Sequence, residues 1–182
     1  MRCFIAISPS DEVRRKISKF AAECAEAFPG KVKPVAASNL HLTLSFLGET
    51  DPSRFEEIFA ALASVRFGRF ELHAQGAGFF PEDGQPRVLW AGAALSDELL
   101  TLNATCEKAV ASLGFPRTSP GFVPHFTVGR VKGSADPRLA EFMAERGDKV
   151  FGAFAADRFF FFSSDLSGKD PVYIPVREFI SI

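Results

Sequence analysis

The chain has 182 residues, of which 47% are hydrophobic and 24% charged, and its formal net charge at pH 7 is −1. This composition is typical of a globular protein with a sizeable core. The net charge excludes an overall basic field that would attract nucleic acid, and a local basic patch stays as an alternative. No apolar run approaches the roughly 18–20 residues of a membrane span, and the three widely spaced cysteines form neither a disulfide framework nor a Cys-x-x-Cys metal pattern. We expect a cytoplasmic protein that does not enter a membrane, and we take it to be a monomer.

The spacing of apolar residues predicts alternating helices and strands. In chain order, the expected elements are a strand over 1–7, a helix over 11–28, an extended piece over 31–35, a strand containing 41–46, a helix around 55–62, strands over 70–80 and 87–93, a helix over 97–113, a strand at 125–128, a short helix around 139–143, and strands over 150–163 and 172–179. Ser10 is the expected N-cap of the first helix. The stretch 150–163 is expected to be a strand pair or one bent strand. Both halves contain a helix, a histidine-bearing strand, a helix and a strand, which indicates an internal duplication in an α+β fold.

Two copies of the pattern His-x-Thr-x occur, at 41–44 and 125–128. The chain has only three histidines, and two of them stand two residues before a threonine. Because alternate residues of a strand point to the same face, each of these histidines is expected beside its threonine. If the two strands meet, two imidazoles and two hydroxyls face one pocket. In the first copy, strict alternation puts His41, Thr43 and Ser45 on one face, and Leu42, Leu44 and Phe46 on the other.

Paired histidines are suited to acid and base catalysis. With an ordinary pKa near 6.5, one imidazole can be neutral and deprotonate water while the other is charged and protonates a leaving alkoxide. Threonine hydroxyls can donate hydrogen bonds to phosphate oxygens. This chemistry requires no metal, and no carboxylate or thiolate lies at zinc-ligand spacing from either histidine.

The alternative is that His41 and His125 are half-buried strand residues bonded to the backbone. Two copies with matching threonines favour the catalytic interpretation. The third histidine, His73, has no threonine two residues later, and we expect it in solvent or at a strand edge.

The motifs and their flanks resemble the 2H phosphoesterase superfamily and, within it, the RNA 2′,3′-cyclic phosphodiesterases, once called 2′-5′ RNA ligases. The stretches that carry the resemblance span nearly the whole chain, at 2–7, 39–49, 86–92, 122–131 and 164–166. The resemblance implies two pseudo-symmetric lobes of antiparallel sheet, with helices packed outside, around a central cleft. It also implies a single bilobal domain over 1–182 with one His-x-Thr-x motif per lobe.

The implied reaction opens a 2′,3′-cyclic phosphate at an RNA 3′ end and leaves a 2′-phosphate, with no metal or cofactor. By motif, His41 resembles the proton donor to the departing 3′ oxygen and His125 the proton acceptor that activates water. The near-symmetry of the motifs leaves open which histidine is the acid. Thr43 and Thr127 would hold phosphate oxygens.

Arg130 matches an arginine that follows the second motif in the family. Strict alternation places it opposite His125, but a bulge at Gly129 would turn it toward the phosphate, and we expect that contact. The family often carries an aromatic residue shortly before the first motif, and the stretch 33–41 has no tryptophan. Phe46 or Phe122 could supply the missing stacking contact to the terminal base, although both are expected in the core.

Other functions use the same residues. RNA 2′-5′ ligation is the reverse reaction with an RNA 5′-hydroxyl in place of water. The substrate could also be a small cyclic nucleotide of the ADP-ribose cyclic phosphate type instead of an RNA 3′ end, tRNA fragments included. A non-enzymatic RNA or nucleotide binder is the fourth possibility, and it does not require two titrating groups.

Overall fold

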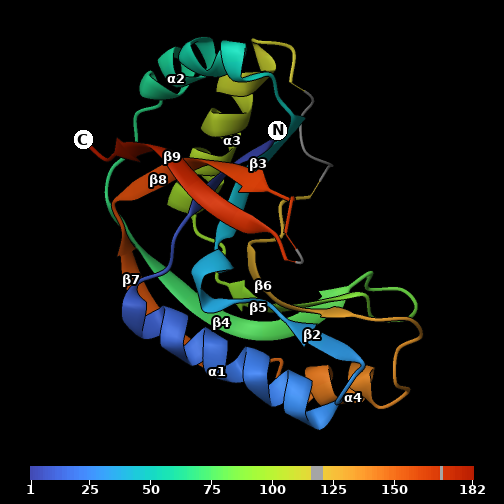
Figure 1. Cartoon of the computed structure of the whole chain (residues 1–182). Coiled ribbons are helices and arrows are strands. Elements are labelled where there is room, and N and C mark those ends of the chain that lie inside the picture. Colours follow the sequence, from blue (N-terminus) through green and yellow to red (C-terminus); the bar gives the residue numbers. More distant parts are fainter. Residues whose placement is uncertain (116–120, 169) are drawn as a thin grey trace.

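The computed structural model describes residues 1–115, 121–168 and 170–182 (Figure 1). Its helices are α1 (Asp11–Ala27), α2 (Phe55–Ala63), α3 (Asp97–Ala111) and α4 (Leu139–Ala144). Its strands are β1 (Arg2–Ile7), β2 (Val32–Pro34), β3 (Leu42–Glu49), β4 (Phe70–Phe80), β5 (Val88–Ala93), β6 (His125–Val131), β7 (Val150–Ala156), β8 (Arg158–Asp165) and β9 (Val172–Ile180). No helix in these residues is long and apolar enough to cross a membrane.

Helix α1 begins and packs as its sequence predicts. The Ser10 side chain accepts a hydrogen bond of 3.4 Å from the Val13 N–H, which satisfies one of the free donors at the helix start. The residues spaced by three and four are all buried in the main core: Val13, Ile17, Phe20, Ala21 and Cys24. The predicted helix is therefore confirmed, with its end at Ala27.

The nine described strands form one antiparallel sheet in the order β7-β4-β5-β6-β3-β1-β8-β9, with β2 beside β6. The expected α+β class is confirmed. The strands expected over 150–163 are present, as β7 and β8, but these two strands do not pair with each other. Strand β7 pairs with β4 at one end of the sheet, whereas β8 pairs with β1 and β9 at the other. The continuous apolar pattern shows that both strands are buried but carries no information on their partners.

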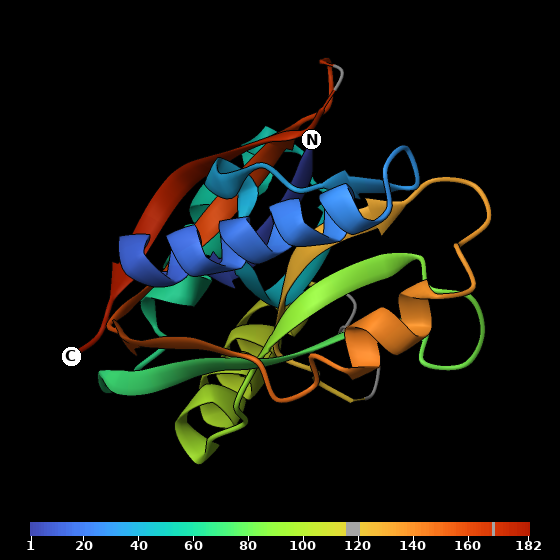
Figure 2. The same ribbon diagram turned by 90° about the horizontal axis from the view of Figure 1, so that it is seen from below.

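The sheet order is symmetric about the contact between β3 and β6. We call β3-β1-β8-β9 the His41 half and β6-β5-β4-β7 the His125 half. Helix α1 follows β1 in the chain but packs against β6 and β7, and α3 follows β5 but packs against β3 (Figures 1 and 2). Each half is thus covered by a helix that starts from the other half. We therefore propose one bilobal domain over 1–182, in which neither half is complete without the other.

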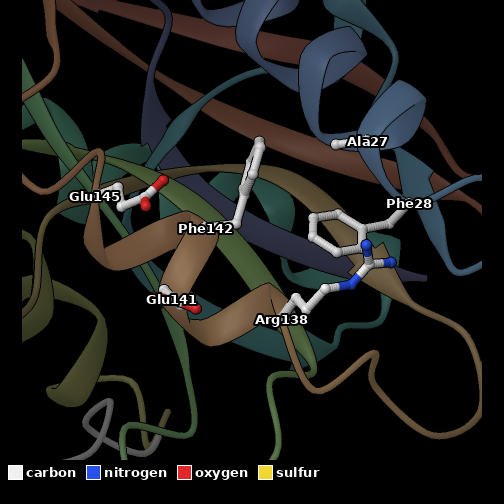
Figure 3. Close-up of a pocket in the computed structure, with 6 residues that line it drawn as sticks. All are labelled: Ala27, Phe28, Arg138, Glu141, Phe142 and Glu145. Atoms are coloured by element: carbon white, nitrogen blue, oxygen red, sulfur yellow. The ribbon is translucent and has the colours of Figure 1, made fainter.

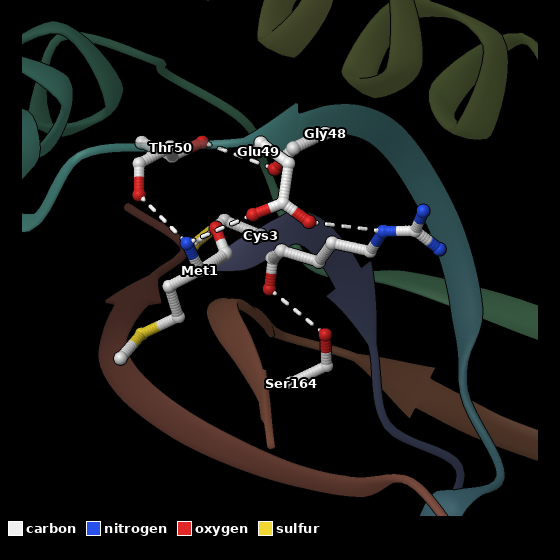
Figure 4. Close-up of polar contacts among 7 residues, drawn as sticks. Met1, Cys3, Gly48, Glu49, Thr50 and Ser164 are labelled. Atoms are coloured by element: carbon white, nitrogen blue, oxygen red, sulfur yellow. Dashed lines mark hydrogen bonds and ion pairs between the residues drawn. The ribbon is translucent and has the colours of Figure 1, made fainter. Parts of the chain in front are cut away.

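Strand β1 lies between β3 and β8 and is fixed at its start by polar contacts (Figure 4). The Met1 amine lies 3.0 Å from Glu49 Oε2, and Arg2 Nε donates to Glu49 Oε1 at 3.2 Å. Ser164 Oγ donates to the Arg2 carbonyl oxygen at 3.0 Å. The ion pairs are exposed and screened by solvent, so each contributes little to stability. Together with the backbone ladder they hold the register that places Phe4 near His41.

Candidate active site

The strands that carry the two motifs meet at one residue pair, Leu42 opposite Phe126. Both side chains are 0% exposed and belong to the main core. Their chain neighbours point to the other face, and in an antiparallel register the residue before one member of a pair lies across from the residue after the other member. His41 therefore lies beside Thr127, and Thr43 beside His125, all four half-buried. We call this surface of the sheet the histidine face.

Both histidines are held by the same local contact. The Nδ1 atom of His41 lies 2.7 Å from the carbonyl oxygen of Asn39, and that of His125 lies 2.7 Å from the carbonyl oxygen of Val123. A carbonyl oxygen can only accept, so Nδ1 carries the hydrogen in each neutral ring and Nε2 is the nitrogen with a free lone pair. The backbone bonds that the alternative interpretation expected are thus present, and they orient both rings through Nδ1, leaving Nε2 outside these bonds.

Aromatic side chains surround each imidazole. The His41 ring lies 4.6 Å from Phe4 and 5.1 Å, edge to face, from Tyr173. The His125 ring lies 5.0 Å, edge to face, from Phe80 and 6.4 Å from Trp90. Phe4 belongs to a small apolar cluster with Ala6 and Phe162 that is separate from the main core. These rings displace water from both histidines.

The aromatic surroundings change the protonation of the pair. Burial is the main cause that lowers the pKa of His41 to about 4, and the charges of His125 and Arg130 act in the same direction. Burial also lowers the pKa of His125, for which the hydrogen bond to the Val123 carbonyl acts against the change. Both histidines are thus mainly neutral at pH 7 in the free protein.

Arg130 lies on the histidine face because β6 contains a bulge. The register jumps from Leu89 opposite Gly129 to Trp90 opposite Thr127, which leaves Val128 without a partner in β5. Gly129 consequently faces the core, where an added Cβ would meet Val32 Cγ1 at 3.0 Å. The next residue, Arg130, points to the same side as Thr127. Its positive charge acts on the His41 imidazole and contributes to lowering the pKa of that ring.

A second bulge changes the face of two residues in β3. Thr43 pairs with Ala6 and Ser45 with Ile5, so Leu44 is the extra residue. Ser45 is 1% exposed and faces the core, whereas Phe46 is 54% exposed and lies opposite Phe4 on the histidine face. The predicted alternation, with Ser45 beside Thr43 and Phe46 in the core, is wrong beyond Leu44. Phe122 does pack against the core, as expected.

The family is identified by comparison with known proteins. Residues 7–90 and 93–173 match the family model described as LigT like Phosphoesterase. The chain belongs to this family. Two relatives named RNA 2′,3′-cyclic phosphodiesterase come from Archaeoglobus fulgidus, 35% identical over 98% of this chain and 99% of the relative, and from Thermotoga maritima, 36% identical over 95% and 91%.

Solved structures agree with this assignment. TT0787 of Thermus thermophilus has a TM-score of 0.84 and 29% identity, over 99% of this chain and 97% of that one. Escherichia coli LigT complexed with 3′-AMP has a TM-score of 0.81 and 25% identity, over the same shares. The resemblance to 2H phosphoesterases is therefore confirmed.

In this LigT-like phosphoesterase, Asn39 is a site residue that the sequence did not single out. It is buried, its Nδ2 donates to the Pro171 carbonyl oxygen at 2.7 Å, and its Oδ1 accepts from the Tyr173 N–H at 3.4 Å. One side chain thus joins the support of His41 to the strand whose Tyr173 ring covers that histidine. In the sequence this residue is visible only as an asparagine two residues before the first motif. That position alone does not indicate a hydrogen bond to Pro171, 132 residues away.

Other parts of the LigT-like chain do not add to this site. Among the described residues, no group of three or more His, Cys, Asp or Glu side chains could hold a metal ion. A hollow between the end of α1 and α4 is lined by Ala27, Phe28, Arg138, Glu141, Phe142 and Glu145 (Figure 3). None of the predicted site residues lines it.

Proposed function

We propose that this chain hydrolyses RNA 2′,3′-cyclic phosphate ends to 2′-phosphomonoesters, with His41 and His125 as metal-independent acid and base. The pairing of Leu42 with Phe126 carries this proposal, because it supports one site built from both motifs. The names of the Archaeoglobus and Thermotoga relatives support the same reaction.

In the proposed reaction, Nε2 of His125 takes a proton from water as the water oxygen bonds to phosphorus. The bond from phosphorus to the 3′ oxygen breaks, and Nε2–H of His41 delivers its proton to that oxygen. Thr43 and Thr127 donate to the non-bridging oxygens, and Arg130 balances the charge of the transition state. The product is a 2′-phosphomonoester with a free 3′-hydroxyl, and proton exchange with solvent restores the two histidines.

Binding of the substrate raises the tendency of His41 to take up the proton that it needs as the acid. The cyclic phosphate is an anion, so it attracts a proton to the histidine pair, and by pairing with Arg130 it removes a repulsion that lowers the pKa of His41. His41 therefore acquires its proton in the complex, where it is needed as the acid. In the opposite assignment, His125 is the acid that protonates the leaving oxygen and His41 is the base that takes the proton from water.

The proposed substrates are RNA 3′ ends, tRNA fragments included, with small cyclic nucleotides as the second class. The solved complex of LigT with 3′-AMP supports a nucleotide ligand on this fold. We infer a monomer, because residues from the two halves of one chain already complete the site. A cytoplasmic location is consistent with Cys3, Cys24 and Cys106, which are free and buried.

The test is hydrolysis of an oligoribonucleotide that ends in a 2′,3′-cyclic phosphate, with EDTA present. Wild type should produce a 2′-phosphate, and His41→Ala and His125→Ala should each lose about 100-fold or more in kcat. His73→Ala is the matched control, because His73 is exposed and paired with Glu71. Loss of wild-type turnover in EDTA would contradict the metal-independent mechanism. Tight binding without turnover would favour the binder, and joining to an added 5′-hydroxyl RNA would reveal the ligase.

A further inference from the structure

Lys33 in the short strand β2 lies on the histidine face beside Arg130. Strand β2 pairs with β6 so that Lys33 is directly opposite Arg130. Residues directly opposite each other in an antiparallel pair point to the same side of the sheet. The preceding residue, Val32, is buried in the main core, so Lys33 points away from the core. Two cations therefore stand side by side next to the proposed phosphate site.

The charge of Lys33 is compensated by a carboxylate from a distant segment. The Lys33 ammonium forms an ion pair with Asp170, which lies between β8 and β9 in the chain. Asp170 precedes Pro171, whose carbonyl oxygen accepts the hydrogen bond of 2.7 Å from Asn39. The asparagine whose backbone supports His41 thus also holds the residue next to Asp170, and it keeps this carboxylate near the site.

The ion pair between Lys33 and Asp170 can be exchanged for a pair with another anion. The two side chains are 39% and 55% exposed, and exposed ion pairs contribute little because water and salt screen them. Like charges directly opposite each other in a sheet repel, so anions bound at both Lys33 and Arg130 would relieve this repulsion. An ammonium group binds phosphate as a point charge and does not demand one orientation of it.

The position of Lys33 fits the next phosphate of an RNA chain. Thr127 and Arg130 are about two regular steps apart along β6, roughly 7 Å, because Val128 is the extra residue of the bulge. Lys33 lies one strand farther, with roughly 5 Å between its Cβ atom and that of Arg130. In RNA, a single ribose separates the 2′,3′-cyclic phosphate from the 5′ phosphate of the same nucleotide. A cyclic phosphate held at Thr127 and Arg130 thus leaves the 5′ phosphate within reach of Lys33.

We propose that Lys33 binds the phosphodiester on the 5′ side of the terminal nucleotide, and that this phosphodiester displaces Asp170 from Lys33. The inference rests on the proposed function, in which the cyclic phosphate lies between His41 and His125. It deepens that function, because an RNA end always carries this phosphodiester, whereas a nucleoside cyclic phosphate with a free 5′-hydroxyl leaves the ion pair intact. Lys33 is thus a residue that determines specificity for RNA ends.

The experiment compares adenosine 2′,3′-cyclic phosphate with its 5′-(methyl phosphate) ester, an anionic diester that adds no second base. The ratio of the two KM values isolates recognition of the 5′ diester. In wild type the ester should have a KM about tenfold lower, and Lys33→Gln should bring the ratio close to one. Asp170→Asn should increase the preference about two- to fivefold, because it removes the competing carboxylate. The double variant should behave as Lys33→Gln does, since the aspartate acts only through the lysine.

Lys16→Gln is the matched control. Lys16 is also an exposed lysine in an ion pair, 2.8 Å from Glu12, but it lies on α1, which packs on the core side of the sheet. The control should keep the wild-type ratio, and so should Lys33→Arg, which retains the charge. For the methyl ester, Lys33→Gln should also reduce the slope of log(kcat/KM) against log salt concentration by about 0.7, the value for one phosphate contact on a single strand.

Two results would overturn the proposal. An equal KM ratio in wild type and Lys33→Gln would show that the lysine does not recognise the diester. A preference for a 5′-phosphomonoester that does not extend to the diester would assign the position to free nucleotides and not to RNA.

Binding separates this proposal from the proposed function. Calorimetric titration with adenosine 2′-monophosphate and with its 5′-(methyl phosphate) ester requires no turnover. If the wild type hydrolyses neither cyclic phosphate but still prefers the ester in a manner that depends on Lys33, the hydrolytic function fails and the phosphodiester site stands. If hydrolysis proceeds and Lys33→Gln binds both ligands as the wild type does, the phosphodiester site fails and the function stands.

Discussion

The carbonyl oxygen of Asn39 lies 2.7 Å from the Nδ1 atom of His41, and Asn39 is itself clamped to β9. The equivalent support of His125 is the carbonyl of Val123, at the same 2.7 Å, but Val123 is 41% exposed and its side chain has no polar group. The two histidines therefore make the same contact to a backbone carbonyl, but the residue that provides the carbonyl is fixed by further hydrogen bonds of its side chain only at His41. His41 is connected through Asn39 to Pro171 and Tyr173.

Replacing Asn39 by Val, the residue at the equivalent position of the second motif, should lower kcat about 10- to 100-fold with little change in KM. The carbonyl that orients His41 remains, but the clamp to β9 is lost and small misplacements of a catalytic group are costly. Steady-state kinetics on the cyclic phosphate oligonucleotide measures the effect. Asn103→Val is the control, because it removes a similar buried bond, from Asn103 Nδ2 to the Leu44 carbonyl oxygen at 2.6 Å. Equal losses of kcat in both variants would indicate general destabilisation and no special role of the clamp.

The pH profiles of kcat/KM and kcat should differ. The kcat/KM profile reports the free enzyme, in which the pKa of His41 is about 4 and that of His125 is also lowered from 6.5. Its optimum should therefore lie below pH 6.5. The kcat profile reports the complex, in which the bound anion stabilises the imidazolium, so it should be displaced to higher pH. Coincident profiles, or a kcat/KM optimum above about pH 7, would contradict this protonation scheme.

Arg130 offers a direct test of the same scheme. Arg130→Gln removes a positive charge near His41, which makes protonation easier and should move the acid limb of kcat/KM to higher pH. The rate also falls because a phosphate ligand is lost. Arg130→Lys keeps the charge and should keep the position of the limb. If both variants show the wild-type limb, the arginine does not act on His41 electrostatically.

The sequence predicted the pair of motifs and most elements because these depend on local periodicity. The faces of Ser45 and Phe46 could not be predicted, because a bulge is set by the register with a distant strand, here β1. For Arg130, the preceding Gly129 indicated a bulge that would turn the arginine toward the site. The bulge in the structure lies one residue before that glycine, at Val128. In each strand the pattern holds up to the bulge and is inverted beyond it.

Long-range partners were the other information that the sequence lacked. The stretch 150–163 has one apolar pattern but supplies strands to both halves. Tyr173 and Phe4 surround His41 from strands far apart in the chain, and no periodicity connects them to the motif. The lowered pKa of His41 in the free protein has the same origin, since burial is its main cause.

Stability should fall on mild acidification. The pKa of His41 is about 4 in the folded protein and near 6.5 when unfolded, so between these values the unfolded chain binds more protons. The free energy of unfolding is therefore highest above about pH 6.5 and decreases toward pH 4, by about 3 kcal/mol at most for this group. Thermal unfolding of wild type and His41→Gln at several pH values should show a shallower decrease in the variant. His73→Gln, at an exposed position, should follow wild type, and identical slopes for all three would exclude His41 as a cause.

The ring of Trp90 lies on Gly78, and this contact permits a final test of how the surroundings of His125 are built. An added Cβ at Gly78 would lie 2.3 Å from Trp90 Cζ2 and 2.5 Å from Cη2, so the indole must move away. Gly78→Ala should destabilise the protein by about 1–3 kcal/mol and lower kcat several-fold, because Trp90 packs beside His125. Trp90 is the only tryptophan, so its fluorescence emission reports the displacement without interference.

Gly68→Ala is the matched control, because nothing lies within 4 Å of the added Cβ there, and it should leave emission, kcat and melting temperature close to wild type. Unchanged emission and kcat in Gly78→Ala would mean that the indole position does not control His125.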